Sequence, residues 1–449
     1  MQEIILPVSE LKKALPGLNK IVANKSPLPI FQSARVARDA NGQLSILATD
    51  LDSFATYNFQ QAQPGSAAAV LVPFGQLARI VKGMNAEETI GLIPEGKEKL
   101  KLRYFIAGCL VEQNLPTWPV DEFPRVPEVN QPSIPLEPEF GTTLRQALEC
   151  CSVDPARRNL NGACLDVTDK RFHHVVGTNG KVLFSANSFG FDLQESVIIP
   201  DSKFLAWTDF MDEEPGLLSV EPGQEAQSAK DGQPAKEARP GYVKLQSGQW
   251  TFITEVIEGK FPDWKQAVPT PNGNWTRIDL SGEAMKQLLL VTPILPGDDQ
   301  PNRPVRLRVD RYLTIEGQNK DDEEWTSVPV QTVNITGEPV SIALNREYLL
   351  KALHFGLNKL EIEGPLSPMV ISRGGKQIII SPLNLDGTKV TAPAQPTTET
   401  ATPASNQPAP QQQPGAPTEE RREEMPRTAK TTAPEAARNE TQTSSTHGR

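Results

Sequence analysis

Apolar and polar residues alternate along three separate stretches of the chain, and a short polar turn interrupts each one. The stretches are ARVARDANGQLSILATD, ACLDVTDKRFHHVVGTN and VRLRVDRYLTIEGQN, at residues 34–50, 163–179 and 305–319. A period of two is typical of strands with one buried face, and a polar turn between two such runs predicts a hairpin. Three similar hairpins at wide spacing indicate an internal repeat.

A helical pattern follows each hairpin and another precedes it. The following segments start at Val72, Ile199 and Leu344, and each opens with a Pro, Asp or Asn start signal before apolar residues at helical spacing. The preceding segments start near Val8, Glu139 and Ser281. A second hairpin-like pair comes after each downstream helix, at residues 99–115, 242–257 and 369–383. Each unit therefore predicts helix, strands, helix, strands, which gives six helix-plus-sheet modules.

These patterns predict an α+β fold of three tandem domains, each made of two modules of helix and antiparallel sheet. The expected boundaries are residues 1–128, 129–270 and 271–390, with a flexible polar insertion at about 223–241 in the second domain. Residues 391–449 form a Pro-, Thr- and Gln-rich tail without any Leu, Ile, Val, Phe, Tyr or Trp. Such a composition cannot bury enough apolar surface to fold, so we expect the tail to be disordered.

Charge and composition exclude several classes of protein. The formal net charge of −10 argues against a surface coated with basic residues, although a local basic lining remains compatible with it. The four cysteines have neither zinc-site nor redox spacing, so we expect buried thiols in a reducing cytoplasm. We find no signal-peptide pattern and no run approaching the ~20 apolar residues of a membrane span. We therefore expect a cytoplasmic protein without metal, cofactor or membrane partner.

Six stretches match the motifs of one protein family in the family's own order. They are KSPLPIFQSARV (25–36), LSILATDLD (44–52), RRNLNGACLDV (157–167), GTNGKVLFSA (177–186), VIEGKFPDWKQAVP (256–269), and GPLSPMVI followed by IIISPLNL (364–385). LSILATDLD alone is weak, whereas the last three are specific. The sequence resembles the bacterial sliding clamp, the β subunit of DNA polymerase III, as a divergent form with an added C-terminal tail.

The resemblance implies a non-enzymatic ring formed by a head-to-tail homodimer, with twelve short helices lining its hole. Such a ring is a processivity factor that encircles double-stranded DNA without sequence preference. It would dock the replicative DNA polymerase and other replication and repair proteins that carry a clamp-binding motif, through a peptide cleft between domains two and three. An ATP-driven clamp loader would open it.

The DNA-binding prediction rests on basic residues in the helical regions and in one loop, because phosphate contacts hold DNA without reading its sequence. By family position, Lys25, Lys82, Arg157 and Arg158 fall where clamps contact DNA. The complete candidate set is Lys12, Lys13, Lys20, Lys25, Arg79, Lys82, Arg145, Arg157, Arg158, Lys286, Arg346 and Lys351. The second domain departs from the pattern, because its second helical segment carries acidic residues at 201, 209 and 212–214. We therefore expect weaker retention there.

The resemblance also places the partner cleft and the subunit contact. The cleft residues are Leu160, Thr178, Gly180, Leu183, Pro262, Asn345, Tyr348, Leu366, Pro368, Ile379, Pro382 and Leu383. Several neighbours, including Lys181, Gln266 and Ser381, differ from the family, so peptide specificity is expected to differ too. The subunit contact falls on Leu110 of the first domain and on Ile294 and Leu295 of the third, although any of these three fits a core position equally well.

Two alternatives stay open. The first is an enzyme, suggested by His173 and His174 near Cys164 and Asp166. Adjacent residues on a strand point to opposite faces, however, and no GxSxG, HExxH or P-loop motif is present. The second is a monomeric clamp-like adaptor that binds replication proteins without encircling DNA. The acidic second domain motivates this adaptor.

Overall fold

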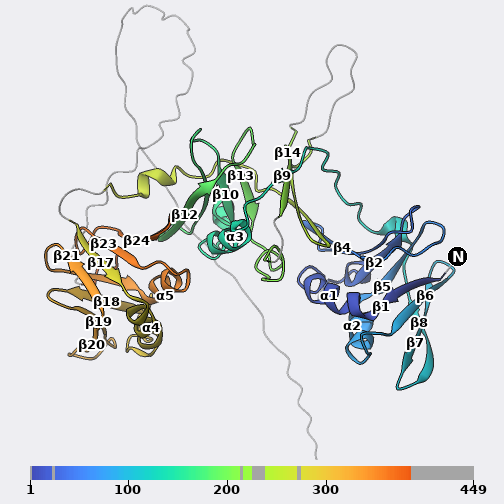
Figure 1. Cartoon of the computed structure of the whole chain (residues 1–449), viewed down its shortest axis with the longest axis horizontal. Coiled ribbons are helices and arrows are strands. Elements are labelled where there is room, and N and C mark those ends of the chain that lie inside the picture. The colour runs from blue at the N-terminus through green and yellow to red at the C-terminus, as the bar shows by residue number, and fades with distance from the viewer. Residues whose placement is uncertain (1–2, 23–25, 213–215, 225–237, 271–274, 386–449) are drawn as a thin grey trace, which may run out of the picture. The chain divides into compact units, whose positions relative to one another are not determined.

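The computed structural model describes residues 3–22, 26–212, 216–224, 238–270 and 275–385. Lys25, the tail at 391–449 and most of the predicted insertion lie outside these ranges. At the base of the insertion, Gln224 and Arg239 exchange two backbone hydrogen bonds of 2.8 Å. The described residues fall in one compact unit, Met1–Val390. Within it, three copies of the same strand-and-helix order follow one another, confirming the predicted α+β fold (Figure 1).

The first repeat (residues 4–122) begins with a strand that runs directly into a helix. Its elements are β1 (Ile4–Pro7), α1 (Val8–Leu18), η1 (Pro29–Gln32), β2 (Ser33–Arg38), β3 (Leu44–Thr49), β4 (Ser53–Asn58), β5 (Ala68–Pro73), α2 (Phe74–Lys82), β6 (Thr89–Glu95), β7 (Lys99–Ile106), β8 (Cys109–Pro116) and η2 (Val120–Glu122). Both helices lie where the apolar periodicity predicts them. In α2, Leu77 and Val81 are four residues apart and both are buried in the core.

The second repeat (residues 134–267) follows the same order with one exception. Its elements are β9 (Ile134–Pro135), α3 (Phe140–Leu148), η3 (Pro155–Leu160), β10 (Gly162–Asp166), β11 (His173–Thr178), β12 (Val182–Phe189), β13 (Val197–Pro200), β14 (Leu217–Glu221), β15 (Tyr242–Ser247), β16 (Trp250–Glu255) and η4 (Trp264–Ala267).

The exception corrects a prediction, because the segment from Ile199 forms turns rather than a helix. The Ala206 N–H donates to the Ser202 carbonyl at 3.1 Å, the Trp207 N–H donates to Phe204 at 3.1 Å, and the Phe210 N–H donates to Trp207 at 3.3 Å. These hydrogen bonds close short turns and do not form the regular ladder of an α-helix. The rings of Phe204 and Phe252 stack at 4.8 Å. Aromatic packing on the sheet thus fixes the segment, and Phe204, Trp207 and Phe210 keep helix-like spacing without a helix. Among the described residues there are five α-helices rather than six.

The third repeat (residues 276–380) has both helices and one additional strand, β21. Its elements are β17 (Thr276–Leu280), α4 (Gly282–Val291), η5 (Thr292–Ile294), β18 (Pro304–Val309), β19 (Leu313–Gly317), β20 (Thr326–Val330), β21 (Val333–Thr336), β22 (Val340–Asn345), α5 (Arg346–His354), β23 (Lys359–Ile362), β24 (Met369–Arg373) and β25 (Lys376–Ile380). The predicted start signals are confirmed here. Ser281 caps α4 by accepting from the Ala284 N–H, and Asn345 caps α5 by accepting from the Glu347 N–H.

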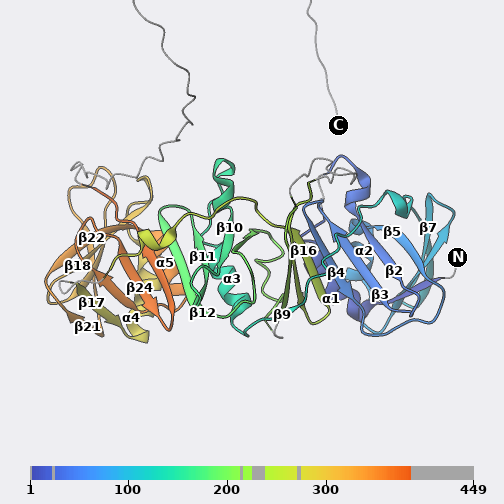
Figure 2. The same cartoon turned by 90° about the horizontal axis from the view of Figure 1, so that it is seen from above.

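Sheets continue from one repeat into the next. The eight-stranded sheet has the order β5-β2-β3-β4-β16-β15-β14-β9, so the first and second repeats join through β4 and β16 (Figure 2). The nine-stranded sheet has the order β13-β10-β11-β12-β25-β24-β23-β17-β21, so the second and third join through β12 and β25. Two four-stranded sheets remain, β1-β6-β7-β8 in the first repeat and β20-β19-β18-β22 in the third.

The two faces of each shared sheet carry different apolar clusters. The large core lies on the helix side, where Phe252 and Tyr57 belong to it. A smaller cluster includes Phe54 and Ile253. Each of these residues is next in sequence to a residue that faces the helices, so it points to the opposite face of the eight-stranded sheet. The nine-stranded sheet has its own outer cluster, made of Leu160, Cys164, Val176, Leu183, Ile198, Ile257, Phe261, Trp264, Trp275, Val370 and Ile379.

Candidate functional site

The helices of the first repeat present the largest group of exposed basic residues among the predicted DNA contacts. Helices α1 and α2 pack against each other, and their solvent-facing positions carry Lys12, Lys13, Arg79 and Lys82, with Lys20 just beyond α1. Lys12 is tied back, because its Nζ donates to the Met84 carbonyl at 2.6 Å. The exposure of Lys13, Lys20, Arg79 and Lys82 is compatible with contact to a phosphate backbone, and their role in DNA binding stays a prediction.

Arg157 and Arg158 are exposed on η3, the loop that precedes β10. Asp154 starts this loop by accepting from the Ala156 N–H at 3.0 Å. The Arg157 guanidinium donates to the Asn179 carbonyl at 3.3 Å and lies 3.9 Å from the Asp154 carboxylate. The η3 loop is therefore held against the turn between β11 and β12, with both arginines at the surface.

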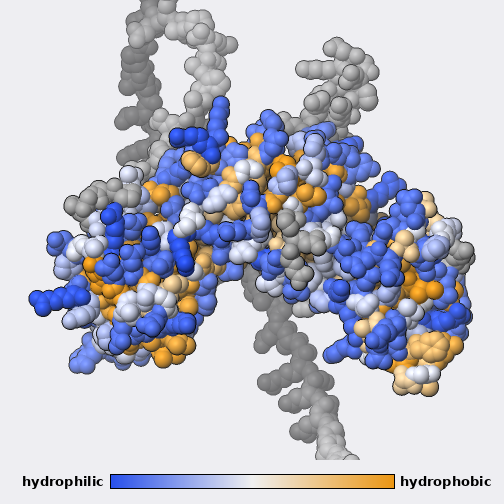
Figure 3. Space-filling model, in the orientation of Figure 1, coloured by the Kyte–Doolittle hydropathy of each residue, from blue (hydrophilic) through white to orange (hydrophobic). Residues whose placement is uncertain are grey.

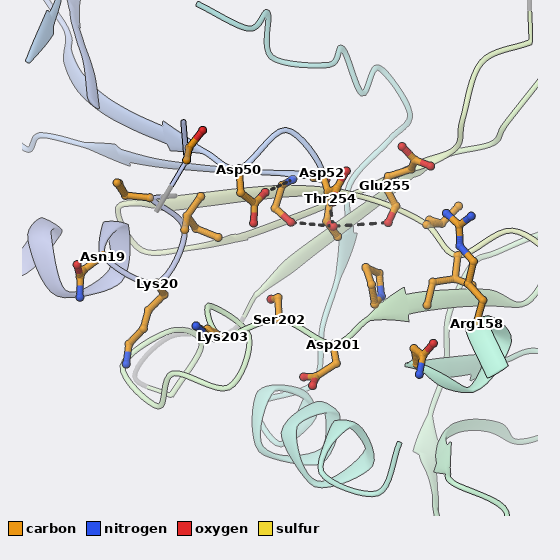
Figure 4. Close-up of a pocket in the computed structure, with 18 residues that line it drawn as sticks. Asn19, Lys20, Asp50, Asp52, Arg158, Asp201, Ser202, Lys203, Thr254 and Glu255 are labelled. Carbon is orange, nitrogen blue, oxygen red and sulfur yellow. Dashed lines mark hydrogen bonds between the residues drawn. The ribbon is translucent and has the colours of Figure 1, made fainter. Parts of the chain in front are cut away.

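Sequence reasoning did not find a cavity that lies where the first two repeats join. It has a volume of about 820 Å³, and its walls include Lys20, Asp50, Arg158, Asp201 and Glu255 (Figure 4). Partial enclosure by these walls raises the pKa of the Asp50 and Asp201 carboxyl groups, although both residues are exposed at the mouth. The cavity mixes both signs of charge, so it does not extend the basic surface of α1 and α2.

The second repeat neutralises its own predicted DNA contact. Arg145, on α3, forms an ion pair with Asp212 and donates to the Phe210 carbonyl at 3.1 Å. Both partners belong to the segment that was predicted to be a helix. The acidic residues noted in the sequence thus cancel a positive charge on this face.

In the third repeat, one predicted DNA contact is wrong. Arg346 is only 1% exposed, and its guanidinium donates to backbone carbonyls of Pro293, Leu295, Pro296 and Arg303. The first residue of a helix can direct its side chain back past the helix N-terminus, and Arg346 does so, under the loop at 293–303. Lys286 is exposed, whereas Lys351 is partly buried and donates to the Glu149 carbonyl at the end of α3.

The predicted partner cleft gathers around the outer cluster of the nine-stranded sheet. Leu160, Leu183 and Ile379 are buried members of that cluster. Leu366 and Pro262 are exposed beside it, and the remaining apolar candidates, Pro368, Pro382 and Leu383, are partly buried. The Leu383 N–H donates to the Ala343 carbonyl at 2.7 Å, which fixes the segment after β25 against β22. Three of the predicted residues therefore share one apolar floor, and the assignment of the whole set to a partner cleft stays a prediction.

Polar groups at this floor are already organised. The Thr178 hydroxyl donates to the Val182 carbonyl at 2.7 Å and accepts from the Gly180 N–H at 3.0 Å. The Asn179 amide donates to the Tyr348 hydroxyl at 3.1 Å, which leaves the phenolic O–H able to donate to a ligand. Asn345 is only 9% exposed, and its side-chain oxygen caps α5 by accepting from the Glu347 N–H at 2.8 Å.

Of the three predicted subunit-contact residues, two are exposed. Leu110 on β8 is 54% exposed and Ile294 on η5 is 79% exposed. Leu295 is only 4% exposed and belongs to the core, so its assignment to the interface is corrected. Phe105 and Ile106 beside Leu110, and Leu290 beside Ile294, were not predicted and are exposed as well. Figure 3 shows an apolar patch on the part of the surface where the β7–β8 hairpin ends. Two consecutive large apolar residues at the end of β7 break its alternation, which was the available signal.

The histidine pair does not form a single site. The His173 ring stacks on Phe191 and its Nδ1 accepts from the Phe191 N–H at 2.8 Å, whereas His174 packs edge-on against Trp264. Phe191 belongs to the helix-side core and Trp264 to the outer cluster, so the two rings lie on opposite faces. Within the described ranges, no group of three or more His, Cys, Asp or Glu side chains could hold a metal ion. The same ranges contain no helix long and apolar enough to cross a bilayer.

Comparison with known proteins identifies the fold. No protein-family model matches the chain. A beta sliding clamp of Pseudomonas putida is 24% identical over 350 residues, covering 76% of this chain and 87% of that protein. The crystal structure of a Caulobacter crescentus DNA polymerase sliding clamp matches with a TM-score of 0.70 at 20% identity, covering 86% of this chain and 100% of that one. A Pseudomonas aeruginosa sliding clamp, the β subunit of DNA polymerase III, solved with griselimycin bound, matches with a TM-score of 0.69 at 20% identity, covering 85% and 99%. The resemblance to a divergent bacterial sliding clamp is thereby confirmed.

Proposed function

From its sliding-clamp fold, we propose that this chain is a DNA polymerase processivity factor. Two copies join head to tail into a ring around duplex DNA. The ring docks the replicative polymerase and other replication and repair proteins at the cleft of the second and third repeats. An ATP-driven loader opens one joint to place the ring on DNA, and the chain itself performs no chemistry.

The observation that carries the ring is a pairing rule within the sheets. Each repeat contributes one half-sheet that ends in its third strand after the first helix, namely β4, β12 or β20. β4 pairs with β16, the last strand of the second repeat, and β12 pairs with β25, the last strand of the third. The partners left over by the same rule are β20 and β8. They belong to one chain but to its two end repeats, so the rule supports pairing between copies.

The residues beside these two open strands suit a reversible joint. Phe105, Ile106 and Leu110 are exposed around the turn from β7 to β8, and Leu290 and Ile294 are exposed at the end of α4. Helix α4 packs beside β20, as α1 packs beside β4 in the closed joint. Exposed apolar residues next to an unpaired strand edge are an aggregation hazard, and a second copy would remove that hazard. Head-to-tail contacts of this kind generate a closed ring when the rotation closes.

DNA retention rests on the helix-side basic residues, chiefly those of the first repeat. Lys and Arg that contact phosphates hold a duplex in any sequence register, which a sliding protein needs. Arg157 and Arg158 add a second basic position. Because Arg145 is paired and Arg346 is buried, the lining is uneven around the hole.

Partner binding rests on the floor formed by Leu160, Leu183 and Ile379, with the Tyr348 hydroxyl as a polar anchor. A few apolar pockets with one oriented donor suit a short extended peptide that ends in aliphatic or aromatic residues. A related clamp was solved with griselimycin bound, which is consistent with ligand binding in this fold.

Retention on circular and linear DNA tests the ring. Purified protein is loaded with a compatible loader onto nicked circular plasmid and onto the same plasmid after linearisation, and DNA-bound protein is separated by gel filtration. A ring stays on the circle and slides off the free ends. Blocking the ends of the linear DNA with bulky bound proteins should restore retention. Equal loss from circular and open linear DNA contradicts encirclement.

The monomeric adaptor is the second candidate, favoured by the neutralised face of the second repeat. Light scattering separates the two proposals. An adaptor keeps a mass near the 49.2 kDa of one chain at micromolar concentration, whereas the ring gives twice that mass.

A further inference from the structure

The loop that carries Ile294 is held from beneath by one buried guanidinium. Arg346 stands at the start of α5, and its Nη1 donates to the carbonyls of Pro293 at 3.4 Å and Leu295 at 2.8 Å. Its Nη2 donates to Pro296 at 2.6 Å, and its Nε donates to Arg303 at 3.2 Å. Arg346 therefore ties both ends of the 293–303 loop to the start of α5.

The charge of this guanidinium is balanced locally. The Asp298 carboxylate lies 3.4 Å from Arg346 Nη1 and 2.6 Å from Arg303, and Arg303 lies 3.1 Å from Glu347. Gly297 has a positive φ of 116°, and a Cβ on it would lie 3.0 Å from Arg346 Nη2. The loop thus folds closely around the side chain, and the space leaves room only for glycine at that point.

This bracing separates two neighbouring residues by function. Leu295 is buried in the core, and its carbonyl is among the closest acceptors of Arg346. Ile294, one residue earlier, is 79% exposed and points away. An apolar side chain at position 346 could fill the same volume, but it could not donate hydrogen bonds to these carbonyls. The unpaired carbonyls would then favour a loop conformation in which water reaches them.

Resting on the proposed function, we infer that Arg346 is a positioning residue for the subunit joint. It contacts neither DNA nor the partner copy. It holds the 293–296 backbone so that Ile294 and Leu290 present a preformed apolar surface to the open edge at β8. Preorganisation lowers the ordering cost that association otherwise carries.

Arg346→Met tests this role, with Arg311→Met, an exposed arginine of the same repeat, as the matched control. The dimer dissociation constant is measured by sedimentation equilibrium on the full chain, alongside urea unfolding. We expect Arg346→Met to weaken the dimer roughly tenfold or more, which corresponds to about 1.4 kcal/mol of association free energy. Arg311→Met should change the constant less than about twofold.

A double-mutant cycle with Ile294→Ala separates positioning from a general loss of stability. If Arg346 acts through Ile294, the loss of affinity caused by Arg346→Met should fall to less than about threefold in the Ile294→Ala background, while its effect on unfolding stays the same. Should Arg346→Met fail to fold, Arg346→Lys replaces it. One ammonium cannot reach all the acceptors of the guanidinium, so a weaker dimer is expected again.

The outcomes are distinct. A dimeric wild type whose affinity is unchanged by either substitution at position 346, or additive effects in the cycle, overturns the positioning role and leaves the ring standing. A wild-type chain that stays monomeric at every concentration overturns the ring, and the positioning role with it.

Discussion

The first and third repeats use equivalent parts of one fold in different ways. In the first repeat, the end of α1 packs directly on two tryptophans of the neighbouring repeat. The packing is so close that a Cβ added to Gly17 would lie 2.4 Å from Trp207 and 2.6 Å from Trp250. In the third repeat, the corresponding end of α4 exposes Leu290, which is 74% accessible. One joint is closed within the chain by buried aromatic rings, and the other is left open.

The basic residues on the helices also differ in exposure between the first and third repeats. Those on the helices of the first repeat are exposed, whereas the third repeat buries Arg346 and occupies Lys351 with a carbonyl of α3. A joint within one chain never needs to separate, so it can be packed like a core. In the proposed ring, the joint between copies opens for loading, and smaller apolar side chains with a braced loop suit such a joint better.

The largest effect is expected at the closed joint. Trp250 is buried and its ring lies 5.1 Å from that of Tyr57. Trp250→Ala should lower the free energy of unfolding by about 3–5 kcal/mol, because it removes a large side chain from a packed site. Trp325→Ala is the matched control beside the open strand β20, where the ring only stacks under Arg306, and should cost about 1 kcal/mol. Urea unfolding measures both, and equal losses would remove the distinction between the joints.

A substitution at the open joint should change the dimer dissociation constant and leave the unfolding free energy of the monomer nearly unchanged. Leu110→Asp is expected to weaken the dimer about a hundredfold, because it places a charge in an apolar contact. The unfolding free energy of the monomer should change by less than about 0.5 kcal/mol. Leu28→Asp is the matched control, since Leu28 is 55% exposed against 54% for Leu110. Sedimentation measures the dimer dissociation constant of both variants. If Leu28→Asp weakens the dimer as much as Leu110→Asp does, the effect is not specific to the open joint.

A smaller difference should separate the basic faces. Lys82→Glu on α2 should shorten retention on circular DNA about threefold to tenfold at moderate salt and reduce the salt dependence by about one phosphate contact. Lys286→Glu on α4 should have about a twofold effect, because fewer exposed basic residues surround it. Retention is followed while KCl is raised. A stronger effect at Lys286 would show that the third repeat, and not the first, dominates the lining.

The smallest effect concerns the cavity at the closed joint. Its walls raise the pKa of Asp201 above the ordinary value of 3.8, so the folded protein holds that proton more tightly than the unfolded chain. The resulting stability is present below the ordinary pKa and is lost as the pH rises through the raised value. At pH 7, Asp201→Asn should therefore stabilise the protein slightly, by less than about 0.5 kcal/mol because the side chain is exposed to screening solvent. Thermal melts at pH 7 and pH 4 should show the gain only at pH 7; a gain at both would point to another cause.

Much of the fold followed from local patterns. The hairpins and the five helices lie at the predicted places, because caps such as Ser281 and Asn345 act within a few residues of the helix they start. The segment from Ile199 failed for the converse reason. Phe204 and Trp207 have helical spacing, yet their partners Phe252 and Trp250 come from a distant strand, and those contacts decide the local conformation.

The candidate sites were found less evenly. That Leu160, Leu183 and Ile379 lie together could be predicted, since they belong to specific motifs. The sequence could not predict whether a charged side chain faces water. Arg346 resembles the other helix arginines in sequence, and only the 293–303 loop folded over it buries its guanidinium. Ile294 and Leu295 are adjacent and chemically alike, so only the backbone direction of η5 separates surface from core. The pairing rule that leaves β8 and β20 unmatched exists only at the level of whole sheets.

The turn into β8 has a practical consequence for following the ring. All four cysteines lie in the described residues, and Cys109 alone is exposed, next to Leu110. Burial raises the pKa of Cys150 and of Cys164 to about 12 and that of Cys151 further still, so these thiols stay protonated and unreactive at neutral pH. A maleimide dye should therefore attach to the unaltered protein at one position, directly beside the proposed seam. The fluorescence of that dye could time the opening and closing of the seam without any engineered label.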